Sequence, residues 1–95
     1  MNAVAEEKHF QEELNRLDER LRRLQEWEKS ASEELKVGWW NQIFQLRKKR
    51  AEAADRLKRL AVSDDERAQA GLKAQVEEAL VDLKTALETA ETRFR

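Results

Sequence analysis

The residues with the clearest capacity for chemistry are Glu6 and His9, whose spacing places both side chains on one face of a helix. A Glu-x-x-His pair supplies ligands in di-iron helical bundles, but such a site needs a second pair and two further glutamates. His9 is the only histidine, and the chain has no cysteine. Adjacent carboxylates, for example Glu77 and Glu78, are expected on solvated helix faces, without the burial that tunes a general acid. We therefore expect no metal, no cofactor and no catalytic residue, and so a protein that is not an enzyme.

A second candidate is the basic segment, residues 47–59, in which seven bases accompany two acids. It begins Arg47-Lys48-Lys49-Arg50, a run that could attract phosphate groups by charge. No aromatic residue is interleaved to stack on bases, and no glycine allows close backbone approach. The formal net charge is −1, so no overall field draws the chain to nucleic acid or to an anionic membrane. We expect these bases to pair with acids of a facing helix. Binding of nucleic acid or anionic surfaces through 47–59 is the alternative function.

The tryptophans are the most informative apolar residues. Trp39 continues the main apolar pattern, whereas Trp40 is rotated by about 100° on a helix and reaches Phe44 one turn away. Val37 widens the same flank, so the apolar arc over residues 35–46 is too broad for one partner helix. The excess is either additional core beneath a third helix or second subunit, which we favour, or a docking site. Trp27 has the same two interpretations.

Composition indicates the elements that carry these residues. Proline is absent, glycine occurs twice and 41% of residues are charged, which is typical of long helices and coiled coils. Apolar residues recur at heptad spacing from Phe10 to Leu60 and again from Ala68 to Phe94. Between them, Ser63 followed by Glu66 has the spacing of a capping box. We predict one all-α domain over residues 1–95, an antiparallel coiled-coil hairpin with helices at about 3–61 and 64–94.

Folding the chain back near residue 63 matches the two patterns. Leu57 then faces Ala68, Leu35 faces Ala90, and the last aromatic residue, Phe94, reaches only to about Ala31. The hairpin therefore leaves uncovered an N-terminal stripe of five large apolar residues: Phe10, Leu14, Leu17, Leu21 and Leu24.

Two arrangements would bury the N-terminal stripe. The unbroken spacing favours one long helix that packs on a second copy. The near-equal lengths of the segments instead favour a break near Ser30 and a three-helix bundle. We favour the first, and predict a self-association interface formed by Phe10, Leu14, Leu17, Leu21, Leu24, Trp27, Trp39, Trp40 and Phe44.

The N-terminal residues 1–8 lack the basic and then apolar pattern of a signal peptide, and no run reaches the roughly 20 apolar residues that span a bilayer. The polar faces carry acids and bases in near-equal number, so an amphipathic helix on a lipid surface is not favoured. We expect a cytoplasmic protein.

From Leu24 onward the chain resembles a family of small bacterial coiled-coil proteins, some of which carry a stress-response label. The resemblance rests on Leu24-Gln25-Glu26-Trp27-Glu28, on Trp39-Trp40-x-Gln42-Ile43-x-x-Leu46-Arg47 and on the terminal Arg93-Phe94. It implies a helical, cytoplasmic, non-enzymatic protein with a stress role, and it supplies no site residues. We therefore expect a structural protein that forms a homodimer or higher oligomer and acts as a scaffold or tether, with an unidentified protein client. Nucleic acid and membrane are the less favoured partners.

Overall fold

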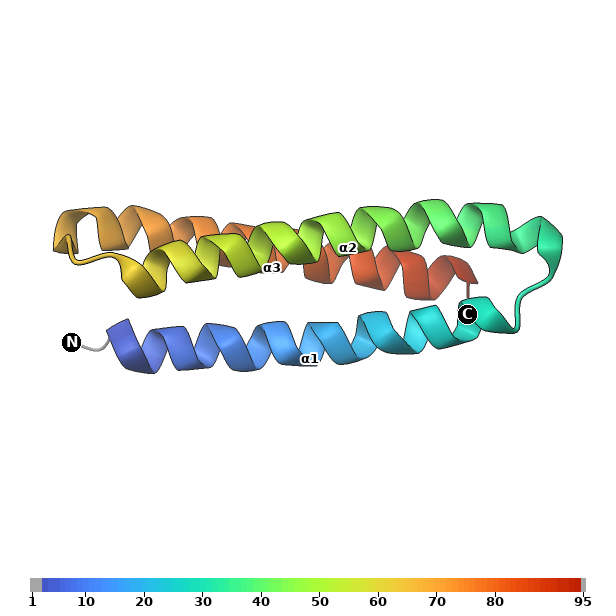
Figure 1. The fold of residues 1–95 in the computed structure, drawn as a ribbon, viewed down its shortest axis with the longest axis horizontal. Coiled ribbons are helices and arrows are strands. Elements are labelled where there is room, and N and C mark those ends of the chain that lie inside the picture. Colours follow the sequence, from blue (N-terminus) through green and yellow to red (C-terminus); the bar gives the residue numbers. More distant parts are fainter. Residues whose placement is uncertain (1–2, 95) are drawn as a thin grey trace.

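The computed structural model describes residues 3–94, with side chains described for residues 6–93, as a bundle of three helices. They are α1 (Ala3–Lys29), α2 (Glu33–Val62) and α3 (Glu66–Phe94), of 27, 30 and 29 residues. Figure 1 shows them side by side along the long axis, with the two connections at opposite ends, so α2 runs antiparallel to both neighbours. The bundle measures 50 × 18 × 17 Å. The prediction of an all-α protein is confirmed, and residues 3–94 contain no strand.

The favoured long helix over residues 3–61 is wrong, and the alternative break near residue 30 is correct. The backbone leaves the helix after Lys29 and enters α2 at the N-cap Ser32, where φ is −66° and ψ is 160°. The hydroxyl of Ser30 donates to the carbonyl oxygen of Trp27 at 3.1 Å, a local bond that competes with continuation of the helix. The carbonyl oxygen of Ser32 accepts the first backbone hydrogen bonds of α2, from Leu35 and Lys36, both at 3.0 Å.

The free energy of burial explains why the chain turns here. All five residues of the N-terminal stripe lie in the core of the bundle. Burying each of these side chains stabilises a fold by about 1.5 to 3 kcal/mol. Three residues that leave a helix forgo backbone hydrogen bonds with a net value of about 1 kcal/mol each, some of which the turn replaces. Folding α1 back onto its own chain is therefore strongly favoured over one long helix with an uncovered stripe.

The predicted turn near residue 63 is present, but its capping residue differs from the prediction. The carboxylate of Asp65, not the hydroxyl of Ser63, accepts the backbone N–H of Arg67, at 2.9 Å. Ser63 instead ends α2, with its N–H donating to the carbonyl oxygen of Leu60 at 3.3 Å. The side-chain amide of Gln69 donates to the carbonyl oxygen of Ser63 at 3.1 Å and ties the turn to α3. A carboxylate suits this position because it also interacts with the positive end of the helix dipole.

The core follows the heptad positions of all three helices. It is continuous along the bundle and consists of Phe10, Leu14, Leu17, Leu21, Leu24, Trp39, Ile43, Leu46, Ala53, Leu57, Leu60, Val76, Ala79, Leu80, Leu83, Leu87 and Ala90. Two residues that the hairpin matching placed on the α2–α3 interface, Leu35 and Ala68, are instead exposed. Both lie in the first turns of their helices, at the ends of the bundle, where neighbouring helices give less cover. The predicted contact of Ala31 with Phe94 falls outside the described side chains.

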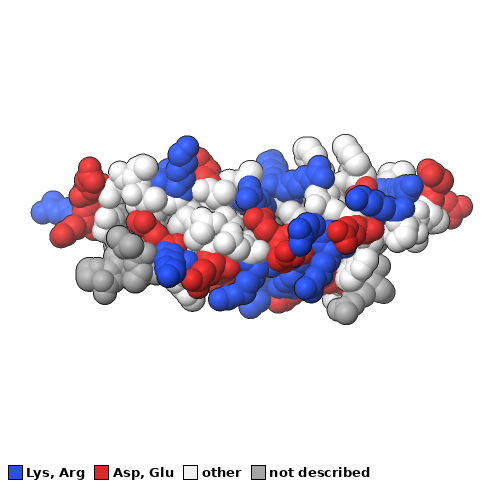
Figure 2. Space-filling view, turned by 60° about the horizontal axis from the view of Figure 1, so that its bottom comes forward, with Lys and Arg blue, Asp and Glu red and all other residues white. Residues whose placement is uncertain are grey.

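Ion pairs join every pair of helices. Lys49 of α2 pairs with Asp82 of α3 at 2.7 Å, and Arg50 of α2 pairs with Asp18 of α1 at 2.8 Å. Two further pairs join α1 to α3: Arg20 with Glu91, and Glu6 with Lys73. Figure 2 shows acidic and basic side chains interspersed along one side of the molecule, with no extended region of one sign on that face. These ion pairs help to determine which faces of the three helices pack together.

Candidate functional site

The N-terminal stripe, predicted as an interface between copies, is covered by the chain's own α2 and α3. Leu24 is 0% exposed, and the other four members are also buried. The premise that these residues lack a partner within the chain is therefore wrong, because the break at residues 30–32 supplies one. Whatever surface the protein uses for binding must be sought elsewhere on the bundle.

The three tryptophans have different environments. Trp39 is buried in the core, and Trp27 is half-buried and packs against it. Trp40, by contrast, is 61% exposed. Trp39 therefore lies in the core, as its place in the main apolar pattern predicts, and the interpretation as additional core holds for Trp27. That interpretation does not hold for Trp40 within this bundle, because most of its surface is exposed.

Trp40 belongs to an exposed apolar surface on α2. Its ring stacks on that of Phe44, with ring centroids 5.7 Å apart and an angle of 17° between the planes. Phe44 is 54% exposed, and Val37, one turn before Trp40, is 68% exposed. We call these three residues the α2 outer surface. By helical geometry they are centred about 150° around α2 from its buried residues, so they lie on the side of α2 opposite the core.

A shallow groove borders this surface where α2 passes α1. It has a volume of about 250 Å³ and is lined by Trp40, Phe44 and Ile43 of α2, with Glu28 and Arg47 at its edge. With its amide oxygen turned toward the guanidinium, Gln25 of α1 accepts hydrogen bonds from Arg47 Nε and Nη2, at 2.8 and 2.7 Å. Beside the aromatic pair, Arg47 is thus held against α1 by Gln25.

Most of the basic segment 47–59 is engaged within the bundle. Besides the ion pairs of Lys49 and Arg50, Arg56 Nη1 donates to the carbonyl oxygen of Gln75 at 3.2 Å, and Arg59 pairs with Asp55 at 3.0 Å. The expectation that acids of the facing helix neutralise this segment holds for Asp82. The other interhelical acid, Asp18, comes from α1, which the hairpin prediction had placed elsewhere.

Hydrogen bonding to Asp18 raises the pKa of Arg50 above its ordinary value, while partial burial acts in the opposite direction. The two hydrogen bonds run from Arg50 Nε and Nη2 to the Asp18 carboxylate, at 2.8 and 3.1 Å. Among residues 6–93, only Lys48 and Lys58 of the seven bases form none of these contacts. Two separate lysines supply little unpaired positive charge with which to bind a polyanion such as nucleic acid.

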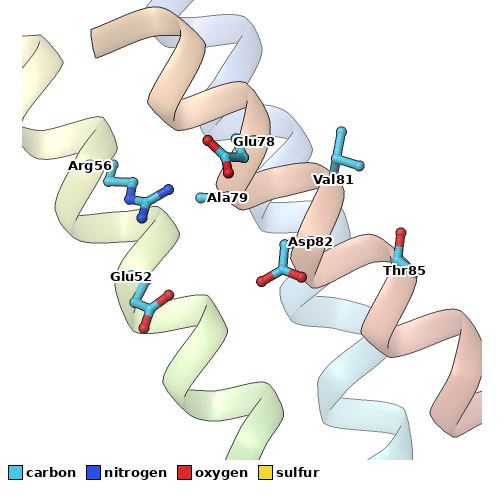
Figure 3. A pocket seen from close by; sticks show the side chains of 7 residues that line it. All are labelled: Glu52, Arg56, Glu78, Ala79, Val81, Asp82 and Thr85. Carbon is cyan, nitrogen blue, oxygen red and sulfur yellow. The ribbon is translucent and has the colours of Figure 1, made fainter. Parts of the chain in front are cut away.

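A second groove lies between α2 and α3 (Figure 3), with a volume of about 340 Å³. Its lining includes the carboxylates Glu52, Glu78 and Asp82 around Arg56. Figure 3 shows Arg56 extending from α2 toward α3, while Val81 points away from α2. Asp82 is already paired with Lys49. The groove is open and charged, and no histidine or thiol lines it.

The Glu6–His9 pair does not form a metal site in the described part of the chain. Glu6 forms an ion pair with Lys73, and the exposed His9 ring lies beside Phe10, with centroids 6.1 Å apart. Residues 6–93 contain no group of three or more histidine, cysteine or acidic side chains arranged to hold a metal ion.

Comparison of the chain with known proteins adds no assignment. No protein-family model, curated protein or solved structure matches it. Within residues 3–94 no helix is sufficiently long and apolar to cross a bilayer. Function therefore has to be argued from the molecule's own surface.

Trp40 and Phe44 stand out in the sequence, whereas the charged residues on either side of them do not. Glu33 and Glu34 precede the α2 outer surface by one turn, and Arg47 and Lys48 follow it. A helical projection of residues 33–48 is the signal that would have linked them to the aromatic pair.

Proposed function

We propose that this protein is a non-enzymatic interaction protein that binds a second copy of itself through the α2 outer surface, Val37, Trp40 and Phe44. One observation carries the proposal: two stacked aromatic rings are more than half exposed, whereas all five residues of the N-terminal stripe are buried. Exposed aromatic clusters on rigid helices are characteristic of protein-binding hot spots, because a large ring loses little conformational entropy when it is covered. The two rings and Val37 are contiguous on one helical face, as a helix-on-helix contact requires.

The remainder of the bundle supports this role. The interhelical ion pairs and the continuous core hold α2 in place within the bundle. The α2 outer surface can therefore be presented to a partner in a fixed orientation. The resemblance to small bacterial coiled-coil proteins favours a cytoplasmic scaffold or tether, with the stress role that it implies and with a protein client in addition to the second copy. Binding of nucleic acid through 47–59 has less support, because most of those bases are engaged within the bundle.

Sedimentation velocity over a range of concentrations tests the proposal. The wild-type chain should sediment above its monomer mass of 11.2 kDa. The variant Trp40→Glu plus Phe44→Glu should return to the monomer mass with an unchanged helical circular dichroism spectrum, since both side chains are exposed. Val81→Glu, which places the same charge on an exposed apolar position of α3, is the matched control and should behave as wild type. A wild-type chain that stays monomeric up to about 1 mM, where even weak dimers form, would overturn the proposal.

A further inference from the structure

The charges beside the α2 outer surface are arranged in a self-complementary order. Reading along α2, the acids Glu33 and Glu34 come first, the apolar surface follows, and the bases Arg47 and Lys48 come last. All four side chains are exposed. The distance from the first acid to the last base is about 22 Å along the helix. When a second copy runs in the opposite direction along this segment, its acids lie opposite the bases of the first copy.

We propose that two copies dock in antiparallel orientation through residues 33–48 of α2, about a twofold axis that passes near Trp40 and Asn41. The inference rests on the proposed function and deepens it by specifying the partner face and its charge register. In this arrangement Glu33 of one copy faces Arg47 of the other, and Glu34 faces Lys48. The symmetry repeats both contacts, so each end of the interface is closed by charges of opposite sign.

The same register places apolar groups in the centre. Val37 of one copy meets Phe44 of the other, and the two Trp40 rings lie close to the axis. The apolar centre with a charged rim is the usual composition of a specific interface. A parallel, in-register pairing would instead place acids against acids and bases against bases, which is destabilising.

The four charged groups are available for these contacts. Glu33 is 94% exposed at its side chain, and its one ion pair, with Lys36, is long at 3.6 Å. Arg47 uses Nε and Nη2 on Gln25, which leaves its other terminal nitrogen free to donate. Glu34 and Lys48 form no ion pair with any residue from 6 to 93.

Charge reversal tests the register. Glu33→Lys plus Glu34→Lys, or Arg47→Glu plus Lys48→Glu, should weaken dimerisation by about tenfold or more, because each makes both ends repulsive. Combining all four substitutions restores opposite charges in the antiparallel arrangement and should return the dissociation constant to within about threefold of wild type. The two double variants mixed together should also associate. If the fourfold variant is as weak as the double variants, the antiparallel register is wrong.

Disulfide trapping gives an independent readout, because the chain has no cysteine of its own. Asn41→Cys, next to the axis, should form a disulfide-linked dimer on oxidation. Ala51→Cys lies on the same face of α2 but about 30 Å from its counterpart across the axis, and should not self-couple. Efficient coupling through Ala51→Cys without coupling through Asn41→Cys would show a parallel pairing and overturn the inference.

The outcomes separate the two proposals. A wild-type monomer would assign the α2 outer surface to another kind of partner and overturn both. A dimer that is lost with Trp40→Glu plus Phe44→Glu, but that ignores charge reversal and Asn41→Cys, would retain the proposed function and overturn only the antiparallel register.

Discussion

Arg20 of α1 and Glu91 of α3 are joined by two hydrogen bonds, from Nε to Oε2 at 3.1 Å and from Nη2 to Oε1 at 2.5 Å. The two residues are 71 positions apart in the chain, and the two helices that carry them run parallel. The side chains are only 27% and 23% exposed, so water screens this pair less than the other ion pairs. This contact fastens α1 to α3, an interface that exists only because the chain breaks at residues 30–32.

A double-mutant cycle on this pair should detect that contact. Arg20→Ala and Glu91→Ala are each expected to destabilise the fold, with a coupling free energy of about 1 kcal/mol, because the pair is bidentate and partly buried. Urea unfolding followed by circular dichroism measures the four proteins of the cycle. The exposed Arg59–Asp55 pair within α2 serves as control and should couple by at most about 0.5 kcal/mol. Equal coupling in the two cycles would contradict the structural role assigned to Arg20.

The coupling between Arg20 and Glu91 should be insensitive to pH near neutrality. Hydrogen bonding to Glu91 raises the pKa of Arg20 above its ordinary value. A raised pKa on a cationic group stabilises the fold fully below the unfolded-state pKa, and that contribution is lost only as pH rises through the folded-state pKa. The guanidinium therefore remains charged between about pH 6 and 9, and the coupling should not change over that range.

Leu24→Ala tests whether the N-terminal stripe is covered by its own chain. Leu24 is fully buried, and its truncation should cost about 2 to 5 kcal/mol of unfolding free energy. Because the covering helices belong to the same molecule, the cost measured by urea unfolding should be the same over a tenfold or greater dilution. Leu35→Ala, at an exposed position of α2, is the matched control and should cost about 1 kcal/mol or less. A Leu24→Ala cost that disappears on dilution would indicate burial between copies instead.

Gly71→Ala should stabilise the protein. Gly71 lies within α3, and a Cβ at this position would meet no atom within 4 Å, so only the backbone preference changes. Alanine is favoured over glycine in a helix by about 0.8 to 1 kcal/mol, and the midpoint of thermal unfolding should rise accordingly. The reverse substitution at an exposed alanine of the same helix, Ala74→Gly, should lower it by a similar amount. A lower midpoint for Gly71→Ala would argue against a regular helix at this position.

How much of this fold could be predicted depends on the range of the interactions concerned. Helical periodicity and the absence of proline act over a few residues, so the all-α class and the turn near residue 63 were predictable. The identity of the capping residue was not, because Ser63 and Asp65 both have suitable side chains and only the path of the turn selects the carboxylate. For the candidate site, Trp40 and Phe44 could be placed one turn apart from spacing alone, which the stacked rings bear out.

The sequence by itself determined which side chains need to be buried, since apolar spacing along a helix is a local property. Only the tertiary structure decided what buries them. A heptad pattern through Ser30 is compatible with a straight helix or a turn, because the local free energies differ by only a few kcal/mol, whereas burial of the N-terminal stripe involves several times as much. That same turn covers the N-terminal stripe with α2 and α3, and leaves Trp40 and Phe44 as the aromatic pair that faces outward.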